Sequence, residues 1–174
     1  MTGAINLSSF ELPSTASDRI RMFHRLWLET GAGNVPDATA FDFAVLSADY
    51  PLLARIGMDQ TARRLVWLEL AVSDNWPFGP PVVNAPVQDC VPPLSIKRVL
   101  RSFEDTLETS IPDYFETTSW MHGGTSVSMA RLVAPILAGA GRQLIALWDI
   151  IEPPATSVPS RGARTRPAKN TLSL

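Results

Sequence analysis

The sequence predicts an α+β domain, in which a five-stranded antiparallel sheet carries a helical crossover on one face and is preceded by an N-terminal helix. Three observations predict this class. Apolar residues recur at helical spacing in residues 17–31 and 94–110. Two strand-like runs lie between those segments, and three more follow the second segment, with turn residues between them. One sheet covered by the helices is the most economical arrangement of that order.

Size and composition favour one domain with extensions. The chain has 174 residues, of which 45% are hydrophobic, so it can bury a core. We expect a flexible lead-in over residues 1–16, a single domain over 17–153 and a disordered basic tail over 154–174. The net charge is −2 and the tail contributes +4, so the rest of the chain carries −6. An acidic body gives no electrostatic reason to bind nucleic acid.

The start of the chain and the cysteine content bear on location. The first residues lack both the basic region and the apolar region of a signal peptide. No apolar run is long enough to cross a bilayer. The single cysteine, Cys90, cannot form an internal disulfide, which favours a reducing compartment. The sequence therefore predicts a cytoplasmic protein without a membrane partner.

The first predicted helix carries an apolar stripe at helical spacing. Ser17 and Asp18 are suitable N-cap residues, and residues 31–34 form a C-terminal stop. A helix of this length must pack its stripe on something, either the rest of the domain or a second copy of the chain. We expect a homodimer whose contact is this stripe, formed by Ile20, Phe23, Trp27 and Leu28.

The middle of the chain predicts two strands and an irregular crossover. Residues 38–48 are expected to form a short helix, followed by strands at 52–58 and 63–71. Residues 73–93 hold six of the fifteen prolines, which excludes a long helix there. Their apolar side chains nevertheless predict an ordered loop with at most single helical turns.

The second half of the chain predicts the long helix and the last three strands. The helix over 94–110 has its apolar stripe at Ile96, Val99, Leu100, Phe103 and Leu107. Strands are expected at residues 114–122, 125–137 and 142–151. Glycine-containing turns separate these strands, which is typical of antiparallel hairpins.

Four segments carry a resemblance to a known family. They are Val35 to Asp42 (VPDATAFD), Pro51 to Ile56 (PLLARI), the helix from Val99 through Pro112, and Arg131 to Leu137 (RLVAPIL). In order and spacing they resemble the PAS-like domains that are common in alphaproteobacteria, over about residues 19–152. The resemblance implies a sensory or regulatory module that binds a small molecule, a partner protein or a second copy of itself. It implies no catalysis.

The aromatic residues leave two interpretations open. They either fill the core or line a pocket between the sheet and the crossover, which would suit a small hydrophobic or aromatic ligand. Arg131 would be the polar member, directed at a ligand carboxylate or at solvent. The predicted pocket residues are Trp76, Phe78, Leu100, Phe103, Met129, Arg131, Leu132 and Leu147.

The sequence predicts no catalytic or metal site and no cofactor. His24 and His122 stand in unrelated contexts, and neither lies on the helix over 94–110, where a PAS-like haem ligand would be expected. Cys90 lacks the surrounding motif of the light-sensing flavin proteins. The glycines of residues 139–141 join two strands instead of opening a helix, so they form no phosphate loop.

The function that the sequence predicts is a non-catalytic sensory or regulatory PAS-like protein. It is expected to form a homodimer, to act through a signalling protein partner, and to hold a small apolar ligand in its core. Two alternatives stay open. One is a ligand-free structural scaffold for dimerisation, and the other is an enzyme whose site the motifs do not reveal.

Overall fold

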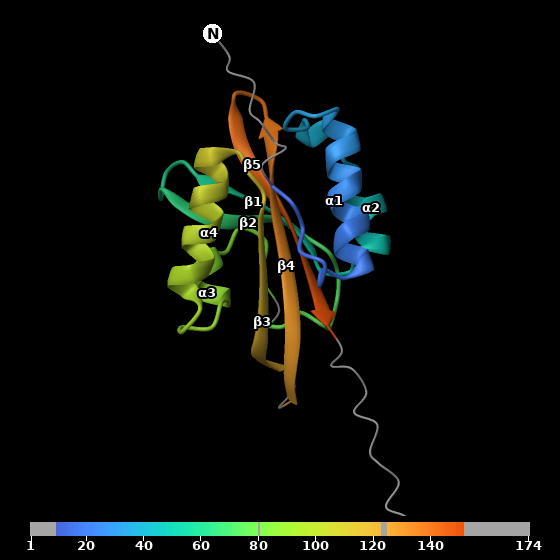
Figure 1. The fold of residues 1–174 in the computed structure, drawn as a ribbon. Helices are drawn as coiled ribbons and strands as arrows, with labels where there is room; N and C mark the ends of the chain where they lie inside the picture. The colour runs from blue at the N-terminus through green and yellow to red at the C-terminus, as the bar shows by residue number, and fades with distance from the viewer. Residues whose placement is uncertain (1–9, 80, 123–124, 152–174) are drawn as a thin grey trace, which may run out of the picture.

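A computed structural model describes residues 10–79, 81–122 and 125–151, and for residues 118–122 and 125–127 it describes the backbone only. Most of the predicted lead-in and all of the predicted basic tail lie outside these residues. The described part is one sheet with helices on both of its faces (Figure 1).

The sheet has five strands in the order β2-β1-β5-β4-β3, and all neighbours are antiparallel. The predicted α+β class and five-stranded antiparallel sheet are therefore confirmed. The strands are β1 (Leu53–Asp59), β2 (Arg64–Leu70), β3 (Asp113–His122), β4 (Thr125–Ala138) and β5 (Gly141–Ile151). The helices are α1 (Asp18–Gly31), the 3₁₀ helix η2 (Ala38–Ala40), α2 (Phe43–Asp49), α3 (Val87–Cys90) and α4 (Ile96–Thr109).

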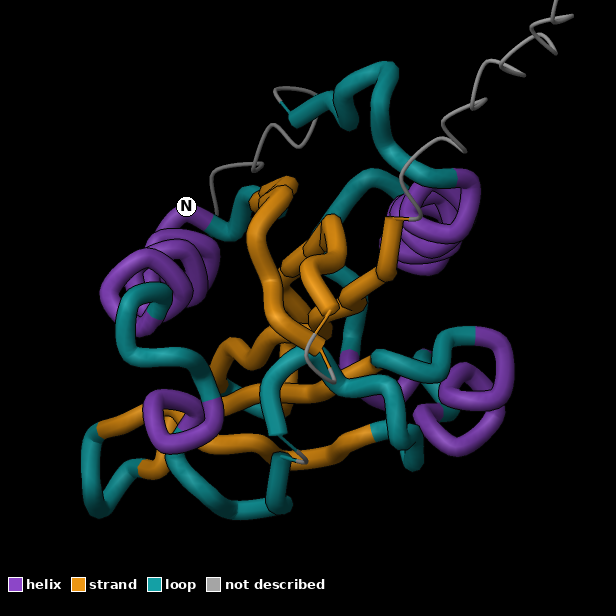
Figure 2. Tube along the Cα trace, turned by 90° about the horizontal axis from the view of Figure 1, so that it is seen from below, coloured by secondary structure: helices purple, strands orange, loops and turns teal. Residues whose placement is uncertain are grey.

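The sheet separates two groups of helices. Helices α1 and α2 lie on one side of it, and α3 and α4 lie on the other side (Figure 1). Seen from below, the strands run between helices on both flanks (Figure 2). We call the two sides the α1 face and the α4 face. The sequence predicts a helical layer on one face of the sheet, formed by the crossover. The structure has a second layer on the other face, because α1 also packs on the sheet.

Helix α1 is held on the sheet by a buried apolar stripe. Ile20, Phe23 and Trp27 each have 0% of their surface exposed, and the indole Nε1 of Trp27 donates a hydrogen bond of 2.8 Å to the Pro135 carbonyl of β4. These side chains cannot face their own sheet and a second copy at once. The dimer contact predicted on them is therefore replaced by an intrachain contact, and of its four residues only Leu28 is partly exposed.

The predicted helix over residues 38–48 is split into two short elements. The Asp37 carboxylate accepts a hydrogen bond of 2.8 Å from the Thr39 backbone and caps η2. The Asp42 carboxylate accepts one of 3.1 Å from the Val45 backbone and caps α2. An aspartate that caps a helix holds non-helical backbone, so two caps five residues apart prevent one continuous helix.

Helix α4 covers the other face and matches the predicted helix closely. Val99, Phe103 and Thr106 are its buried residues. At its C-terminal end, the Arg142 guanidinium of β5 donates hydrogen bonds to the Leu107 and Glu108 carbonyls, which have no partner within the helix. The proline-rich segment before α4 contains only the single-turn helix α3 among its described residues, as its composition predicts.

Candidate ligand site beneath helix α4

A partly enclosed cavity lies between the N-terminal half of α4 and strands β3, β4 and β5. Its volume is about 40 Å³. Since a water molecule needs roughly 10–15 Å³ of such space, the cavity has room for a group of a few heavy atoms. The described residues that line it are Ser95, Arg98, Val99, Phe115, Thr117, Met129, Ala130, Arg131 and Trp148.

The register of the sheet explains why three of these side chains meet. Phe115 of β3 pairs with Arg131 of β4, which pairs in turn with Trp148 of β5. Residues directly opposite one another in neighbouring strands project to the same face of the sheet. Helix α4 contributes Arg98 and Val99 from above, because they lie three and four residues after its N-cap Ser95, and residues at those spacings share one helix face.

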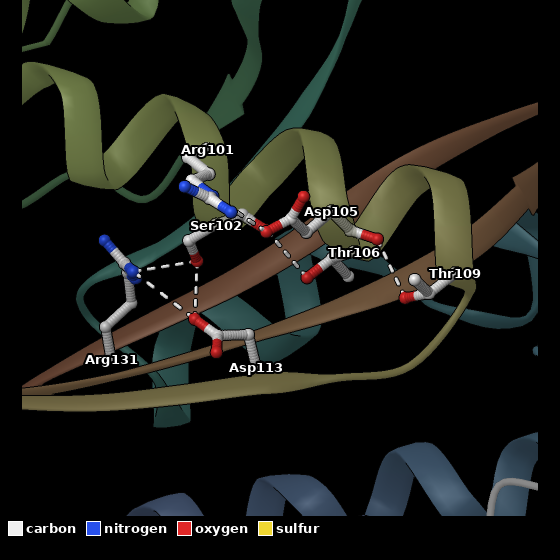
Figure 3. A network of polar contacts seen from close by, with 7 residues as sticks. All are labelled: Arg101, Ser102, Asp105, Thr106, Thr109, Asp113 and Arg131. Carbon is white, nitrogen blue, oxygen red and sulfur yellow. Dashed lines mark hydrogen bonds and ion pairs between the residues drawn. The ribbon is translucent and has the colours of Figure 1, made fainter.

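Arg131 is the buried charge of the site. It is 5% exposed. One of its guanidinium nitrogens, Nη2, donates a hydrogen bond of 2.9 Å to Ser102 Oγ of α4. Ser102 Oγ donates one of 2.5 Å to Asp113 Oδ2 at the start of β3, and Arg131 Nη2 lies 3.6 Å from the same oxygen. Figure 3 shows the three side chains as a closed triangle, which ties α4 to β3 and β4.

Aromatic rings surround the charge. The Arg131 guanidinium carbon lies 5.2 Å from the Phe103 ring centre and 5.8 Å from that of Phe115. The guanidinium carbon of Arg98 lies 4.9 Å from the centre of the same Phe115 ring. Cations in such positions are attracted by the negative face of the ring. Burial lowers the pKa of Arg131 to about 10, Asp113 opposes that change, and Arg98 adds to it. Arg131 is therefore still charged at neutral pH.

The hydrogen bonding of Arg131 is incomplete. Its Nε is buried and has no hydrogen-bond partner among the described residues. An unused donor on a buried charged group costs more than one on a neutral group, because the water that it lost is not replaced. The cavity therefore lies beside a group that lacks an acceptor.

Next to the cavity, further aromatic side chains form a packed cluster around Trp148. Trp148 lies with its ring centre 5.8 Å from Trp76, 5.6 Å from Phe78 and 5.9 Å from Trp67. Trp76 also donates from Nε1 to the Ala71 carbonyl at 3.2 Å. The core interpretation of these aromatic side chains therefore holds for Trp76 and Phe78, which fill space and do not line the cavity.

The predicted pocket residues divide into three groups. Met129 and Arg131 line the cavity, and Phe103 and the partly buried Leu100 of α4 belong to the surrounding core. Trp76 and Phe78 belong to the packed cluster. Leu132 and Leu147 lie outside the site, because adjacent residues of a strand project to opposite faces.

The contacts of β5 fix which face is which. Leu132 pairs with Leu147, and the next pair on the same face of the sheet is Ala130 with Asp149, two residues along each strand. Asp149 accepts hydrogen bonds from Ser17 at 2.6 Å and Arg19 at 2.7 Å. This strand face, which includes Leu147, therefore carries α1 and not α4.

Apart from Arg131, the polar lining residues were not predicted from the sequence. Arg98 lies outside the apolar stripe predicted for the helix over 94–110, and the predicted pocket residues include none of Ser95, Arg98 and Thr117. A signal was available, since Asp113, Phe115 and Thr117 alternate along a strand and so share a face. Their closeness to Ser95 and Arg98 depends on how α4 sits on the sheet, which spacing alone does not define.

The remaining candidates for chemistry stay apart. The His24 ring lies between Phe10 and Trp27, with ring centres at 5.3 and 6.2 Å, and burial lowers its pKa. The side chains of His122 and Trp120 lie outside the described residues. Cys90 is a partly exposed free thiol. Within residues 10–79, 81–122 and 125–151, no group of three or more His, Cys, Asp or Glu side chains is placed to hold a metal ion.

Comparison with known proteins gives no family assignment. No family model matches the chain, and no curated protein matches it. In the part of the chain that the structure describes, no helix is both long enough and apolar enough to cross a bilayer. Function is therefore inferred from the geometry beneath α4 and from the sequence resemblance.

Proposed function

We propose that this protein is a cytoplasmic sensory or regulatory module of the PAS-like kind, which binds a small molecule beneath α4 and acts through a partner protein without catalysis. The observation that carries the proposal is the cavity of about 40 Å³ beside the incompletely bonded guanidinium of Arg131. Cavities that combine apolar walls with a few polar groups are typical of ligand sites.

The network around Arg131 provides a route for a signal. Ser102 belongs to α4, and its hydroxyl bonds both Arg131 of β4 and Asp113 of β3. A ligand that engages Arg131 changes the position or strength of those bonds, so it favours one placement of α4 over another. The outer side of α4, with exposed Lys97, Arg101 and Glu104, is then the surface that a partner reads.

Self-association remains part of the proposal, on a different surface from the α1 stripe. Met22 of α1 and Val45 of α2 are largely exposed, and both helices lie on the same side of the sheet (Figure 1). Exposed apolar side chains of this kind are suited to a contact between copies.

Mass spectrometry of the purified chain tests the proposal. Under native conditions, a mass above a whole multiple of the chain mass that is lost on denaturation would support a bound ligand. Thermal unfolding in the presence of a panel of small metabolites detects a ligand that purification removes, because binding to the folded state raises the unfolding temperature. A bare native mass together with no thermal shift for any compound would overturn ligand binding.

A ligand-free dimerisation scaffold is the second candidate function. It is favoured by the packed aromatic cluster around Trp148, because three of the predicted pocket residues, Trp76, Phe78 and Phe103, have ring centres 5.8, 5.6 and 6.4 Å from that of Trp148. A scaffold of this kind gives a bare dimer in the native mass spectrum and the same unfolding temperature in every compound.

A further inference from the structure

We propose that the ligand held beneath α4 is a small monovalent carboxylate, bound by Arg131 inside the cavity and by Arg98 at its rim. This inference rests on the proposed ligand-binding function and names the chemical class of the ligand. It follows from the charge of the lining, from the unused donor, and from the size of the space.

The charge of the lining favours an anion. Arg98 and Arg131 both line the cavity, and no carboxylate is among the lining residues that the structure describes. The nearby Asp113 offsets at most one of these two charges. Its side chain is 44% exposed, it lies 3.6 Å from Arg131 Nη2, and its Oδ2 is already engaged by Ser102. Two cations beside one partly solvated carboxylate leave a net positive site.

The Nε–H of Arg131 indicates the kind of acceptor. It is buried and without a partner among the described residues, whereas Nη2 is held by Ser102. A guanidinium presents its N–H groups as a planar fork that matches the two oxygens of a carboxylate. A carboxylate oxygen in the cavity would supply the missing acceptor for Nε.

The start of α4 adds a second source of positive potential. Ser95 is the N-cap residue, but its side chain makes no capping hydrogen bond, and it lines the cavity. The first-turn N–H groups of a 14-residue helix lack partners within the helix and carry partial positive charge. Helix end and guanidinium thus act on the same space.

Size and wall chemistry narrow the anion to a short one. A cavity of about 40 Å³ holds a group of a few heavy atoms, such as formate, acetate or propionate. The walls also include Val99, Phe115, Met129 and Trp148, which suit a short alkyl group. Divalent anions such as sulfate fit less well, because desolvating two charges against apolar walls costs more than desolvating one.

Nuclear magnetic resonance of the ¹⁵N-labelled full chain tests the class of ligand. Sodium acetate, sodium chloride and the neutral isostere acetamide are titrated separately, the two salts to equal ionic strength. We expect saturable shifts of the Arg131 Nε–H and Trp148 indole signals with acetate only. In Arg98→Gln the dissociation constant for acetate should rise about tenfold, the scale of one charge-assisted hydrogen bond.

Lys97→Gln is the matched control for Arg98→Gln. It removes one positive charge from the adjacent residue of α4, which is exposed and does not line the cavity. Its acetate affinity should stay within about twofold of the parent, because screened surface charges contribute little. Equal weakening in both variants would show a general electrostatic effect and would overturn the site.

The other outcomes separate the two proposals. Saturation by acetamide but not by acetate would overturn the anion class and leave ligand binding intact. Equal saturation by chloride and acetate would overturn carboxylate recognition in favour of an unselective anion site. If none of the three probes binds, the carboxylate inference falls. Ligand binding itself falls only if the native mass is bare and the metabolite panel also gives no thermal shift.

Discussion

The two faces of the sheet solve the problem of a covering helix in different ways. On the α1 face, the polar groups that hold the helix are paired: Trp27 donates to Pro135, and Asp149 accepts from Ser17 and Arg19. Further along the same face, Arg55 Nε and Gln143 Oε1 are buried without a hydrogen-bond partner among the described residues. On the α4 face, Arg131 Nε and the indole Nε1 of Trp67 are both buried without a hydrogen-bond partner among the described residues. The hydrogen bonds of Trp27 and Asp149 and the buried apolar stripe fix α1 on the sheet. The α4 face retains unmet bonding capacity next to a cavity, which is why the ligand is proposed there.

The largest expected effect comes from breaking the α1 attachment. Trp27→Ala removes a fully buried side chain and should lower the free energy of unfolding by about 3–5 kcal/mol, the range for large-to-small changes in a core. Arg25→Ala on the same helix is the control. Its side chain is exposed and lies outside the proposed self-association surface, so the change should stay within about 0.5 kcal/mol. Urea denaturation measures both, and a comparable loss in the two variants would contradict the assigned faces.

A matched pair of tryptophans sharpens the comparison. Trp27 and Trp67 are equally buried, but only Trp27 has a hydrogen bond at its indole nitrogen. The change to Phe removes similar apolar area at both positions. At Trp27 it also removes the hydrogen-bond donor to the Pro135 carbonyl. Trp27→Phe should therefore cost about 1–2 kcal/mol more than Trp67→Phe in the same urea experiment. Equal costs would mean that the unpaired indole has a partner after all.

The two carboxylates give a smaller difference. The Asp149 side chain is 8% exposed and bonded by α1, whereas Asp113 on the α4 face is much more exposed. Asp149→Asn should lower the free energy of unfolding by about 1–3 kcal/mol, since it weakens two charge-assisted bonds. Asp113→Asn should cost less than about 1 kcal/mol. Thermal unfolding at low salt ranks the two variants, and the reverse ranking would refute the comparison.

The smallest effect is a pH dependence that belongs to the α1 face. Burial lowers the folded-state pKa of His24 below its ordinary value of 6.5. The unfolded chain then binds a proton more readily than the folded chain, so stability falls as pH drops below about 6.5 towards the folded-state pKa. His24→Gln should reduce this loss between pH 7 and 5.5. His122→Gln, which changes the only other histidine, should reduce it less. A larger effect of His122→Gln would contradict the assignment of this titration to His24.

The elements were largely predictable from sequence, because their signals are local. The apolar stripe of residues 94–110 defines α4 to within two residues at its start, and the proline density correctly restricts the crossover to a single helical turn. The surface that α1 packs against was not predictable. An apolar stripe indicates that a helix is covered, but whether its own sheet or another copy covers it depends on tertiary packing.

The site was predictable only in part. Met129 and Arg131 were found, since alternate residues of a strand share a face. The same rule places Leu132, the neighbour of Arg131, on the opposite face of the sheet, so a pocket that contains Arg131 does not include Leu132. Arg98 could not be assigned, because a charged residue at the edge of a helical stripe points to solvent or to a rim according to the tilt of the helix.

The position of β5 in the middle of the sheet has a consequence for biosynthesis. Leu53 of β1 pairs with Leu147 of β5, and Asp149 anchors Ser17 at the start of α1. During synthesis, the first helix and the first hairpin therefore lack these contacts until β5 has left the ribosome. Pairings so distant in sequence slow folding, and meanwhile Trp27 and Trp67 stay accessible to chaperones. A nascent chain that stalls before β5 lacks Trp148, which packs beside Trp67, and lacks the strand that joins β1 to β4.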